Sequence, residues 1–240
     1  MYEQRFYRHW SAREDLIRTE ITVGESDLLI LSDKDIERIS TQALLSVRKV
    51  IESYISEHPE FKTSLEPLTV SKDANETIRG MAKAGRLYSV GPMAAVAGAV
   101  AQSVGIAARK TTSTIIVENG GDIFASSDKP LTVALYAGES SPFTDKLAFE
   151  IPASEGIGVC TSSGKVGPSF SFGRADAVVA IHRDAMVADA AATSIANRIQ
   201  RPEDVEPVVE SERKRAVLEG LIVCMENKLG LWGDFELKRR

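Results

Sequence analysis

One segment of the sequence combines a carboxylate and a hydroxyl at helical spacing. Asp189 and Thr193 are four residues apart in a run made mostly of alanine, so their side chains lie one turn apart on one helix face. Such a pair suits a hard cation such as Mg²⁺ or Ca²⁺, because these ions take oxygen ligands and Mg²⁺ completes its shell with water and phosphates. The flat alanine surface beside them would let a bulky ligand sit against the helix. Taken alone, the spacing favours an ordinary packing helix with one solvated aspartate.

A glycine-rich turn lies between two predicted strands. Asn119, Gly120, Gly121 and Asp122 separate the β-rich runs 114–118 and 123–126. The simpler interpretation is a tight hairpin, since consecutive glycines supply the positive φ values that such turns require. The same geometry exposes backbone amides in an anion-binding concavity, where glycine lets a ligand approach the main chain. Taken alone, the spacing favours the plain turn.

A loop rich in hydroxyl groups follows a further predicted strand. The run 158–165 has five residues between its first glycine and its Gly-Lys pair, and Val166 stands where a P-loop has Ser or Thr. ATP binding through a P-loop is therefore disfavoured. The loop still suits hydrogen bonding to phosphate or ribose oxygens, while an ordinary serine-glycine loop explains it equally well. The binding candidates here are Thr161, Ser162, Ser163 and Gly164.

Small residues fill the segment from Gly91 to Ala101. Pro92 is expected at the first position of a helix, a favoured placement, and the alanines and glycines that follow allow very close packing. The helix N-terminus would present its amides toward a nearby anion, which makes Gly91 and Met93 candidates for ligand contact. A buried core helix is the competing interpretation.

Composition narrows the classes of function. The 240 residues carry a formal net charge of -5, which argues against a dedicated nucleic-acid binder. Cys160 and Cys224 form no CxxC pair, so zinc-ribbon and thioredoxin-type sites are excluded. Residues 1–20 lack the apolar region of a signal peptide, and the apolar run 93–108 falls short of the ~20 residues that span a bilayer. We expect a soluble cytoplasmic protein without a nucleic-acid or membrane partner.

The elements that must position these residues come in groups. An N-terminal hairpin precedes a long amphipathic helix over 36–55, and further helices are expected over 75–84 and from residue 92. Short β-rich runs fill 114–160, followed by a strand at 177–181, a helix over 185–199 and a final hairpin around 221–237. This grouping predicts an α+β fold with mixed or antiparallel β-sheets packed with helices. No linker or repeat interrupts the chain, so we expect a single domain over residues 1–240.

In this order, the four motifs resemble those of the ApbE superfamily, whose founding members are flavin transferases. The resemblance runs from about residue 87 to residue 198 and includes the turn at 119–122 and the loop at 161–164, which has one additional serine. Its most specific part is the Ala-Asp-Ala-x-Ala-Thr motif, matched by residues 188–193. The segment 90–98 looks closer to a shorter branch of ApbE-like proteins, some members of which are linked to sulfide assimilation and homocysteine formation.

The resemblance implies roles for these residues. Asp189 and Thr193 would bind a divalent cation, Mg²⁺ or Ca²⁺. The glycine turn and hydroxyl loop would hold the phosphates of FAD, FMN or a similar diphosphate ligand, or the adenosine part of FAD. The implied activity is FMN transfer from FAD to a protein hydroxyl, or FAD hydrolysis by a Mg²⁺-dependent pyrophosphatase. The sequence indicates no catalytic residue and no acceptor protein.

Two departures from the superfamily keep alternatives open. ApbE transferases are typically exported, whereas no export signal is recognisable here, and the stretch 170–176 lacks the histidine of the corresponding family segment. One alternative is a non-catalytic or accessory factor in sulfide assimilation or homocysteine biosynthesis, in which the pocket or Cys160 handles sulfide. Another is a homo-oligomer whose Ala/Gly helix serves only as an interface.

Overall fold

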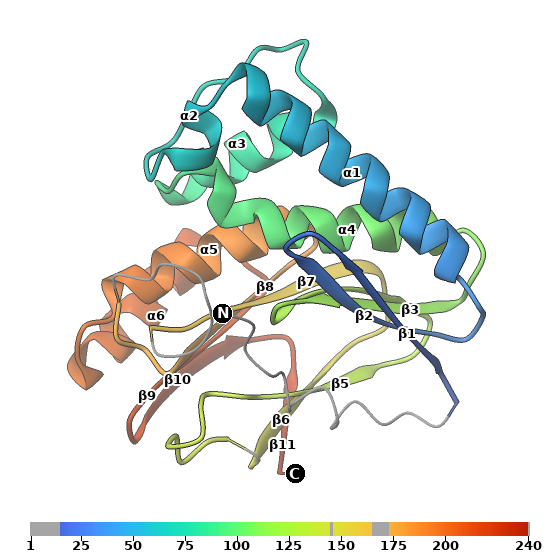
Figure 1. Cartoon of the computed structure of the whole chain (residues 1–240). Coiled ribbons are helices and arrows are strands. Elements are labelled where there is room, and N and C mark those ends of the chain that lie inside the picture. The colour runs from blue at the N-terminus through green and yellow to red at the C-terminus, as the bar shows by residue number, and fades with distance from the viewer. Residues whose placement is uncertain (1–14, 145, 165–172, 240) are drawn as a thin grey trace.

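A computed structural model describes residues 15–144, 146–164 and 173–239 (Figure 1). Two predictions fall partly outside the described residues. They concern most of the N-terminal segment, which was expected to lack a signal peptide, and residues 170–172 of the stretch without histidine. An eight-stranded sheet forms the centre, and every strand pair described is antiparallel. In spatial order its strands are β1 (Ile17–Val23), β2 (Ser26–Ser32), β3 (Thr114–Asn119), β4 (Asp122–Ser127), β7 (Ser154–Ser162), β8 (Ala177–His182), β9 (Gly220–Met225) and β10 (Lys228–Gly233).

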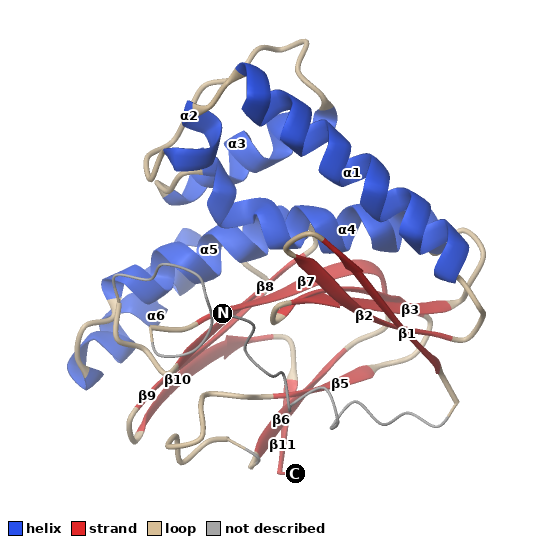
Figure 2. Ribbon diagram, in the orientation of Figure 1, coloured by secondary structure: helices blue, strands red, loops and turns tan. Residues whose placement is uncertain are grey.

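Helices cover one face of this sheet, and a small second sheet lies over its other face (Figure 2). The small sheet contains β11 (Glu236–Arg239), β6 (Leu147–Ile151) and β5 (Leu131–Ala134). The helices are α1 (Glu37–Glu57), α2 (Glu60–Thr63), α3 (Glu76–Tyr88), the 3₁₀ helix η2 (Pro92–Ala95), α4 (Val96–Ala108), α5 (Ala185–Arg198), the 3₁₀ helix η3 (Pro202–Asp204) and α6 (Val205–Arg215). This arrangement confirms the predicted α+β fold class.

The central strands are buried on both faces because their side chains alternate between two cores. In β8, Val178 and Ala180 join the core under the helices, whereas Val179 and Ile181 join the core under the small sheet. Side chains along a strand point to opposite faces with a period of two. The continuous apolar sequence of β8 therefore fits a strand between two layers.

No single helix in the described residues is both long and apolar enough to cross a membrane. The segments Glu76–Tyr88 and Pro92–Ala108 meet that criterion only as a pair, bent by 106°.

Three sequence-based boundaries were wrong. The helix expected over 75–84 continues through Gly85 to Tyr88 and ends at Ser89, whose φ is 57°. Gly85 instead serves packing, since a Cβ there would lie 2.7 Å from the Val90 carbonyl oxygen. The turn predicted over 227–233 is strand β10, and the last strand, β11, pairs with β6 instead of closing a hairpin. Helix α6 was not predicted. Its Pro207 lies in the first turn, where proline removes no intrahelical hydrogen bond.

Helix α4 approaches the sheet closely at Gly105. A Cβ on Gly105 would lie 2.2 Å from the Cδ1 atom of Phe124, whose buried ring is enclosed by the main core. We expect Gly105→Ala to lower the free energy of unfolding by about 1–3 kcal/mol through overpacking, although the same change stabilises an exposed helix by about 1 kcal/mol.

Urea denaturation tests this expectation, with Ser103→Ala on the same helix as the control. Equal or greater stability of Gly105→Ala would show that Phe124 can move aside.

Candidate functional site

Four segments that are far apart in the sequence meet around two buried carboxylates, Asp122 and Asp189. They are the start of α4, the turn between β3 and β4, the end of β7 and the middle of α5. Backbone amides of α4 and β7 donate hydrogen bonds to the two carboxylates, and the turn is tied to α4 by a side-chain hydrogen bond. These segments correspond to the four motifs singled out in the sequence.

Asp189 links the two central helices. Its Oδ2 atom accepts a hydrogen bond of 2.9 Å from the Gly98 amide at the start of α4. The absence of a side chain at Gly98 makes this contact possible, since a Cβ there would lie 2.3 Å from the Ala185 carbonyl oxygen and 3.0 Å from the Asp189 Cβ. The expectation that the helix N-terminus presents open amides to a ligand is therefore corrected at Gly98, whose amide is bonded to Asp189.

The glycine turn has the backbone geometry that its sequence requires. Gly120 and Gly121 have φ values of 71° and 100°. The Gly121 amide donates a 2.7 Å hydrogen bond to Oε1 of Glu118, and Nδ2 of Asn119 donates to the Ala97 carbonyl oxygen at 3.3 Å. The turn is thus a hairpin, as the simpler interpretation had it, and it is also fastened to the start of α4.

A third hydrogen bond from a backbone amide to a carboxylate lies at the end of β7, after those from Gly98 to Asp189 and from Gly121 to Glu118. Oδ1 of Asp122 accepts a 3.2 Å hydrogen bond from the Thr161 amide. Each of three backbone amides, those of Gly98, Gly121 and Thr161, therefore donates to a carboxylate of this chain. The main influences on the two aspartates are burial, their mutual repulsion, Glu118, the Cys160 thiol and backbone amides, with no lysine or arginine among them. The site is acidic.

Burial and mutual repulsion shift the protonation of these groups. Burial raises the pKa of Asp189 to about 7, although hydrogen bonds from the Gly98 and Ala97 amides act in the opposite direction. The pKa of Asp122 is raised well above its usual range by burial first and by the charge of Asp189 second. The pKa of the Cys160 thiol is raised as well, first by burial and then by the charges of Asp122 and Asp189. Burying two carboxylates close together is costly, and the raised pKa values express that cost.

Thr193 lies one turn after Asp189 on α5 and is half-buried. The alanines around this pair have a different role from the one predicted. Ala190, Ala191 and Ala192 are at most 1% exposed and belong to the main hydrophobic core. They therefore pack the helix against its neighbours and offer no flat surface for a ligand ring.

The remaining predicted residues lie at the edges of this cluster. Ser162 ends β7, Ser163 is half-buried, and the Gly164 amide donates to the Ala175 carbonyl oxygen at 2.9 Å. Gly91 packs against the backbone of Ser64, where a Cβ would be 1.8 Å from the carbonyl oxygen, and Met93 packs against the main core. The contacts of Gly91 and Met93 are thus packing contacts.

Sequence reasoning missed the buried glutamate and the glutamine that support the cluster. Glu118 was read as part of a strand, although its spacing of three from Gly121 permits the hydrogen bond that the turn makes. Gln102 accepts a 2.6 Å hydrogen bond from the Ala185 amide, and a polar residue in an apolar helix was the available signal. His182 accepts from the Asp184 amide at 2.9 Å and so supports the entry into α5.

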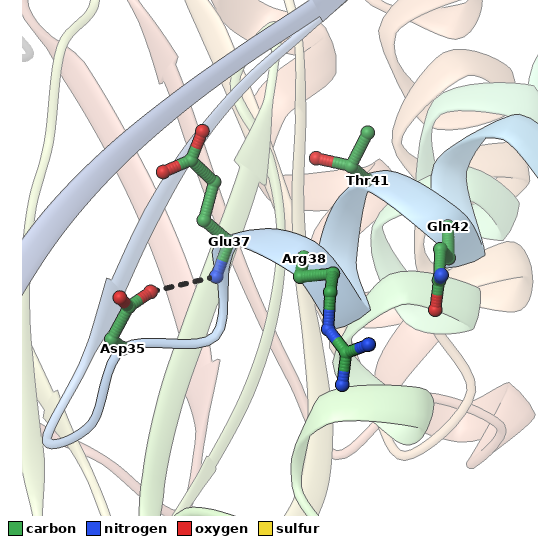
Figure 3. A pocket seen from close by; sticks show the side chains of 5 residues that line it. All are labelled: Asp35, Glu37, Arg38, Thr41 and Gln42. Carbon is green, nitrogen blue, oxygen red and sulfur yellow. Dashed lines mark hydrogen bonds between the residues drawn. The ribbon is translucent and has the colours of Figure 1, made fainter.

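A surface hollow of about 350 Å³ lies elsewhere, at the start of α1 (Figure 3). It is open to solvent and none of the predicted site residues lines it; its lining residues are Asp35, Glu37, Arg38, Thr41 and Gln42. Oδ1 of Asp35 accepts a 3.1 Å hydrogen bond from the Glu37 amide, which caps the first turn of α1. The hydrogen bond of Asp35 is therefore explained by its place at the start of α1.

Within the described residues, no group of three or more His, Cys, Asp and Glu side chains is placed to hold a metal ion. A cation at Asp189 and Thr193 would therefore need further oxygen ligands from the backbone, water or a bound ligand.

The fold is shared with solved flavin transferases. The flavin transferase ApbE from Vibrio cholerae superposes with a TM-score of 0.53 at 11% identity, covering 90% of this chain and 96% of that one. The apo form of the flavinyl transferase ApbE from Pseudomonas stutzeri gives 0.53 at 12% identity, covering 93% and 94%. At these identities the likeness establishes the fold alone.

Sequence comparison establishes the family. A family model described as AbpE bacteria matches residues 8–217, and the chain belongs to this family. Archaeal relatives named UPF0280 protein include one from Methanococcus aeolicus, 40% identical over 91% of this chain and 90% of its own length. Another, from Methanospirillum hungatei, is 38% identical over 91% and 88%. These matches confirm the resemblance to ApbE-like proteins.

The raised pKa of Asp189 predicts an unusual dependence of stability on pH. Because this pKa rises from 3.8 to about 7 on folding, the folded chain holds a proton that the unfolded chain releases at intermediate pH. The free energy of unfolding of the metal-free protein should therefore fall as the pH rises from about 4 to 7. In Asp189→Asn the amide oxygen still accepts from Gly98 and position 189 no longer titrates, so we expect the loss of stability over this pH range to be smaller by at least about 1 kcal/mol.

Urea unfolding between pH 5 and pH 8 in the presence of EDTA measures this difference. Parallel pH profiles for the wild type and Asp189→Asn would contradict it.

The positive φ of Gly121 predicts a graded response to substitution. The space beside it is adequate, since a Cβ would lie 4.0 Å from Thr161 Cβ, and the cost comes from the backbone. We expect Gly121→Val to lose about 1–3 kcal/mol of stability and Gly121→Ala less, because a β-branched residue resists positive φ most strongly.

Gly120→Asn is the matched control, since asparagine tolerates the left-handed region. If Gly121→Val were as stable as Gly120→Asn, the positive φ of Gly121 would not constrain the turn or the site.

Proposed function

We propose that this protein binds a flavin nucleotide, FAD, as a complex with a divalent cation held by Asp189 and Thr193. The observation that carries the proposal is the set of backbone amides that donate to Glu118, Asp122 and Asp189. These amides fix three carboxylates in a small buried region, and the pKa values of the two aspartates among them are raised by burial. Such a region repels a diphosphate on its own and accepts it together with a cation.

The donor set fits Mg²⁺. This ion commonly takes one or two carboxylates from a protein and completes its octahedral shell with substrate phosphates and water. A bound divalent cation would neutralise the diphosphate and stabilise an AMP leaving group. Mg²⁺ is the first choice, and Ca²⁺ would use the same oxygen ligands.

The residues of this chain have separate tasks in the proposal. Asp189 supplies the anionic ligand and Thr193 the hydroxyl from the next turn. The glycine turn brings backbone close to the ligand without side-chain obstruction. The segment from Thr161 to Gly164 supplies hydroxyl groups for phosphate or ribose oxygens. Asp122 stays bonded to the Thr161 amide and adds negative charge that favours the cation.

The names of the structural neighbours support a flavin-related activity. FMN transfer and FAD hydrolysis both break the diphosphate bond and release AMP, and they differ in the acceptor of the FMN moiety: a protein hydroxyl in the first, water in the second. We place FMN transfer first, because the fold matches flavin transferases over 90% or more of this chain.

The alternative role in sulfide assimilation stays a prediction. The position of Cys160 does not favour its use there, because the side chain is fully buried and burial raises the pKa of its thiol. A nucleophilic cysteine is instead partly exposed and has a lowered pKa.

Fluorescence titration of FAD tests the proposal. We expect FAD to bind in Mg²⁺ and not in EDTA, and Asp189→Ala to weaken Mg²⁺-dependent binding by about 100-fold, or about 2.7 kcal/mol. The same variant should lose less than this in stability, because a buried charge that disfavours folding is removed together with its hydrogen bond.

Ser194→Ala on the same helix should leave both quantities unchanged. FAD affinity that is equal with and without Mg²⁺, or that survives in Asp189→Ala, would refute the assignment of Asp189 to a cation. Mass spectrometry for an FMN-modified protein, and detection of AMP, then separates transfer from hydrolysis.

A further inference from the structure

Both backbone polar groups of Ala185, the first residue of α5, are held by side chains from other elements. Its amide donates to Oε1 of Gln102 on α4 at 2.6 Å. Its carbonyl oxygen accepts a 3.4 Å hydrogen bond from the Cys160 thiol on β7. The first amides of a helix have no intrahelical acceptor, so Gln102 satisfies a group that would otherwise be unpaired.

Two glycines bring the neighbouring backbones against the same residue. A Cβ on Gly98 would lie 2.3 Å from the Ala185 carbonyl oxygen, and one on Gly158 would lie 2.4 Å from the Ala185 Cα. Ala185 is itself fully buried. The start of α5 is therefore fixed by direct contact with both α4, which lies beside α5 in the helical layer, and β7 of the sheet below (Figure 1).

The fixed residue lies one helical turn before Asp189. Residues four apart occupy the same helix face, and Gly98 contacts both of them: the Ala185 carbonyl oxygen and the Asp189 Cβ. A shift of Ala185 along α4 would therefore move the Asp189 carboxylate away from the Gly98 amide, to which it is bonded at 2.9 Å.

We infer that Gln102 and Cys160 are positioning residues, which hold Ala185 and thereby set the place of the Asp189 carboxylate against α4. The expected effect on cation affinity rests on the proposed function. The expected effect on the position of Asp189 does not depend on it. It gives Cys160 a role as a hydrogen-bond donor in place of the nucleophilic or sulfur-carrying role considered from the sequence.

The side chains suit this task. The Cys160 thiol also lies near the Asp122 carboxyl, whose charge helps to raise the pKa of the thiol after burial. One side chain therefore touches both the anchor of α5 and the second carboxylate of the site. Gln102 is half-buried on α4, where Ser103 is the other polar side chain, and a leucine there would pack without accepting a hydrogen bond.

The test compares Gln102→Leu and Cys160→Ala, which remove the hydrogen-bonding group, with Gln102→Glu and Cys160→Ser, which retain one. The first readout is the hydrogen-exchange rate of the Gly98 amide in the metal-free protein, measured by NMR relative to the Val104 amide of the same helix. The second is the affinity for Mn²⁺ alone, measured by calorimetry well below the unfolding transition. Ser103→Ala, next to Gln102 and bonded within its own helix, is the matched control.

We expect Gln102→Leu to accelerate exchange at Gly98 relative to Val104 by about tenfold and to weaken Mn²⁺ binding by about the same factor, as for other residues that orient a metal ligand. Cys160→Ala should act in the same direction, and the two retaining variants and Ser103→Ala should stay near the wild type. Equal acceleration at Gly98 and Val104, without rescue by Gln102→Glu, would show a merely structural role and overturn the inference.

The outcome for the proposed function is read separately. If the wild type binds no Mn²⁺ while Gly98 exchange responds as expected, the cation site falls and the positioning role stands. If Mn²⁺ binds and the Gly98 exchange of both removing variants equals that of the wild type, the positioning role falls and the cation site stands.

Discussion

The close contact between α4 and α5 at Gly98 is the constraint on which the site depends. Only a residue without a side chain lets the Gly98 amide reach the Asp189 carboxylate, because a Cβ would collide with the Ala185 carbonyl oxygen 2.3 Å away. The small residues of both helices follow from this distance, since alanines let the two backbones approach over their length. The alanines and glycines that suggested an interface or a ligand surface allow α4 and α5 to pack closely against each other.

The same contact decides the electrostatic character of the site. Glycine turns and helix N-termini are anion-binding elements in many proteins, and here the amides of Gly98, Gly121 and Thr161 bind carboxylates of the chain itself. The hydrogen bonds hold acidic groups in a buried region against their repulsion. The result is a cluster of buried carboxyl groups in place of open amides, and a cation is the complement that we propose for it.

The sequence predicted the α+β class and the segments that meet, because strand alternation and glycine turns are local signals. It did not predict how the amides would be used, because Gly98 and Asp189 are 91 residues apart and only the folded chain shows that they touch. It also missed α6, for which no helix was expected after residue 199, and it assigned the alanines 190–192 to a ligand surface when the core buries them. Long-range packing decided each of these points.

Glu118 shows that the acidic character of the site includes a residue beside the glycine turn for which the sequence predicted no role. Its side chain is 7% exposed, it accepts from the Gly121 amide, and its charge contributes to the raised pKa of Asp122. A ligand phosphate that reached the Gly121 amide would have to displace this carboxylate, and the displaced charge would move away from Asp122. Since both changes would alter the balance between the carboxylates and the proposed cation, the turn and the proposed cation site would not act independently of each other.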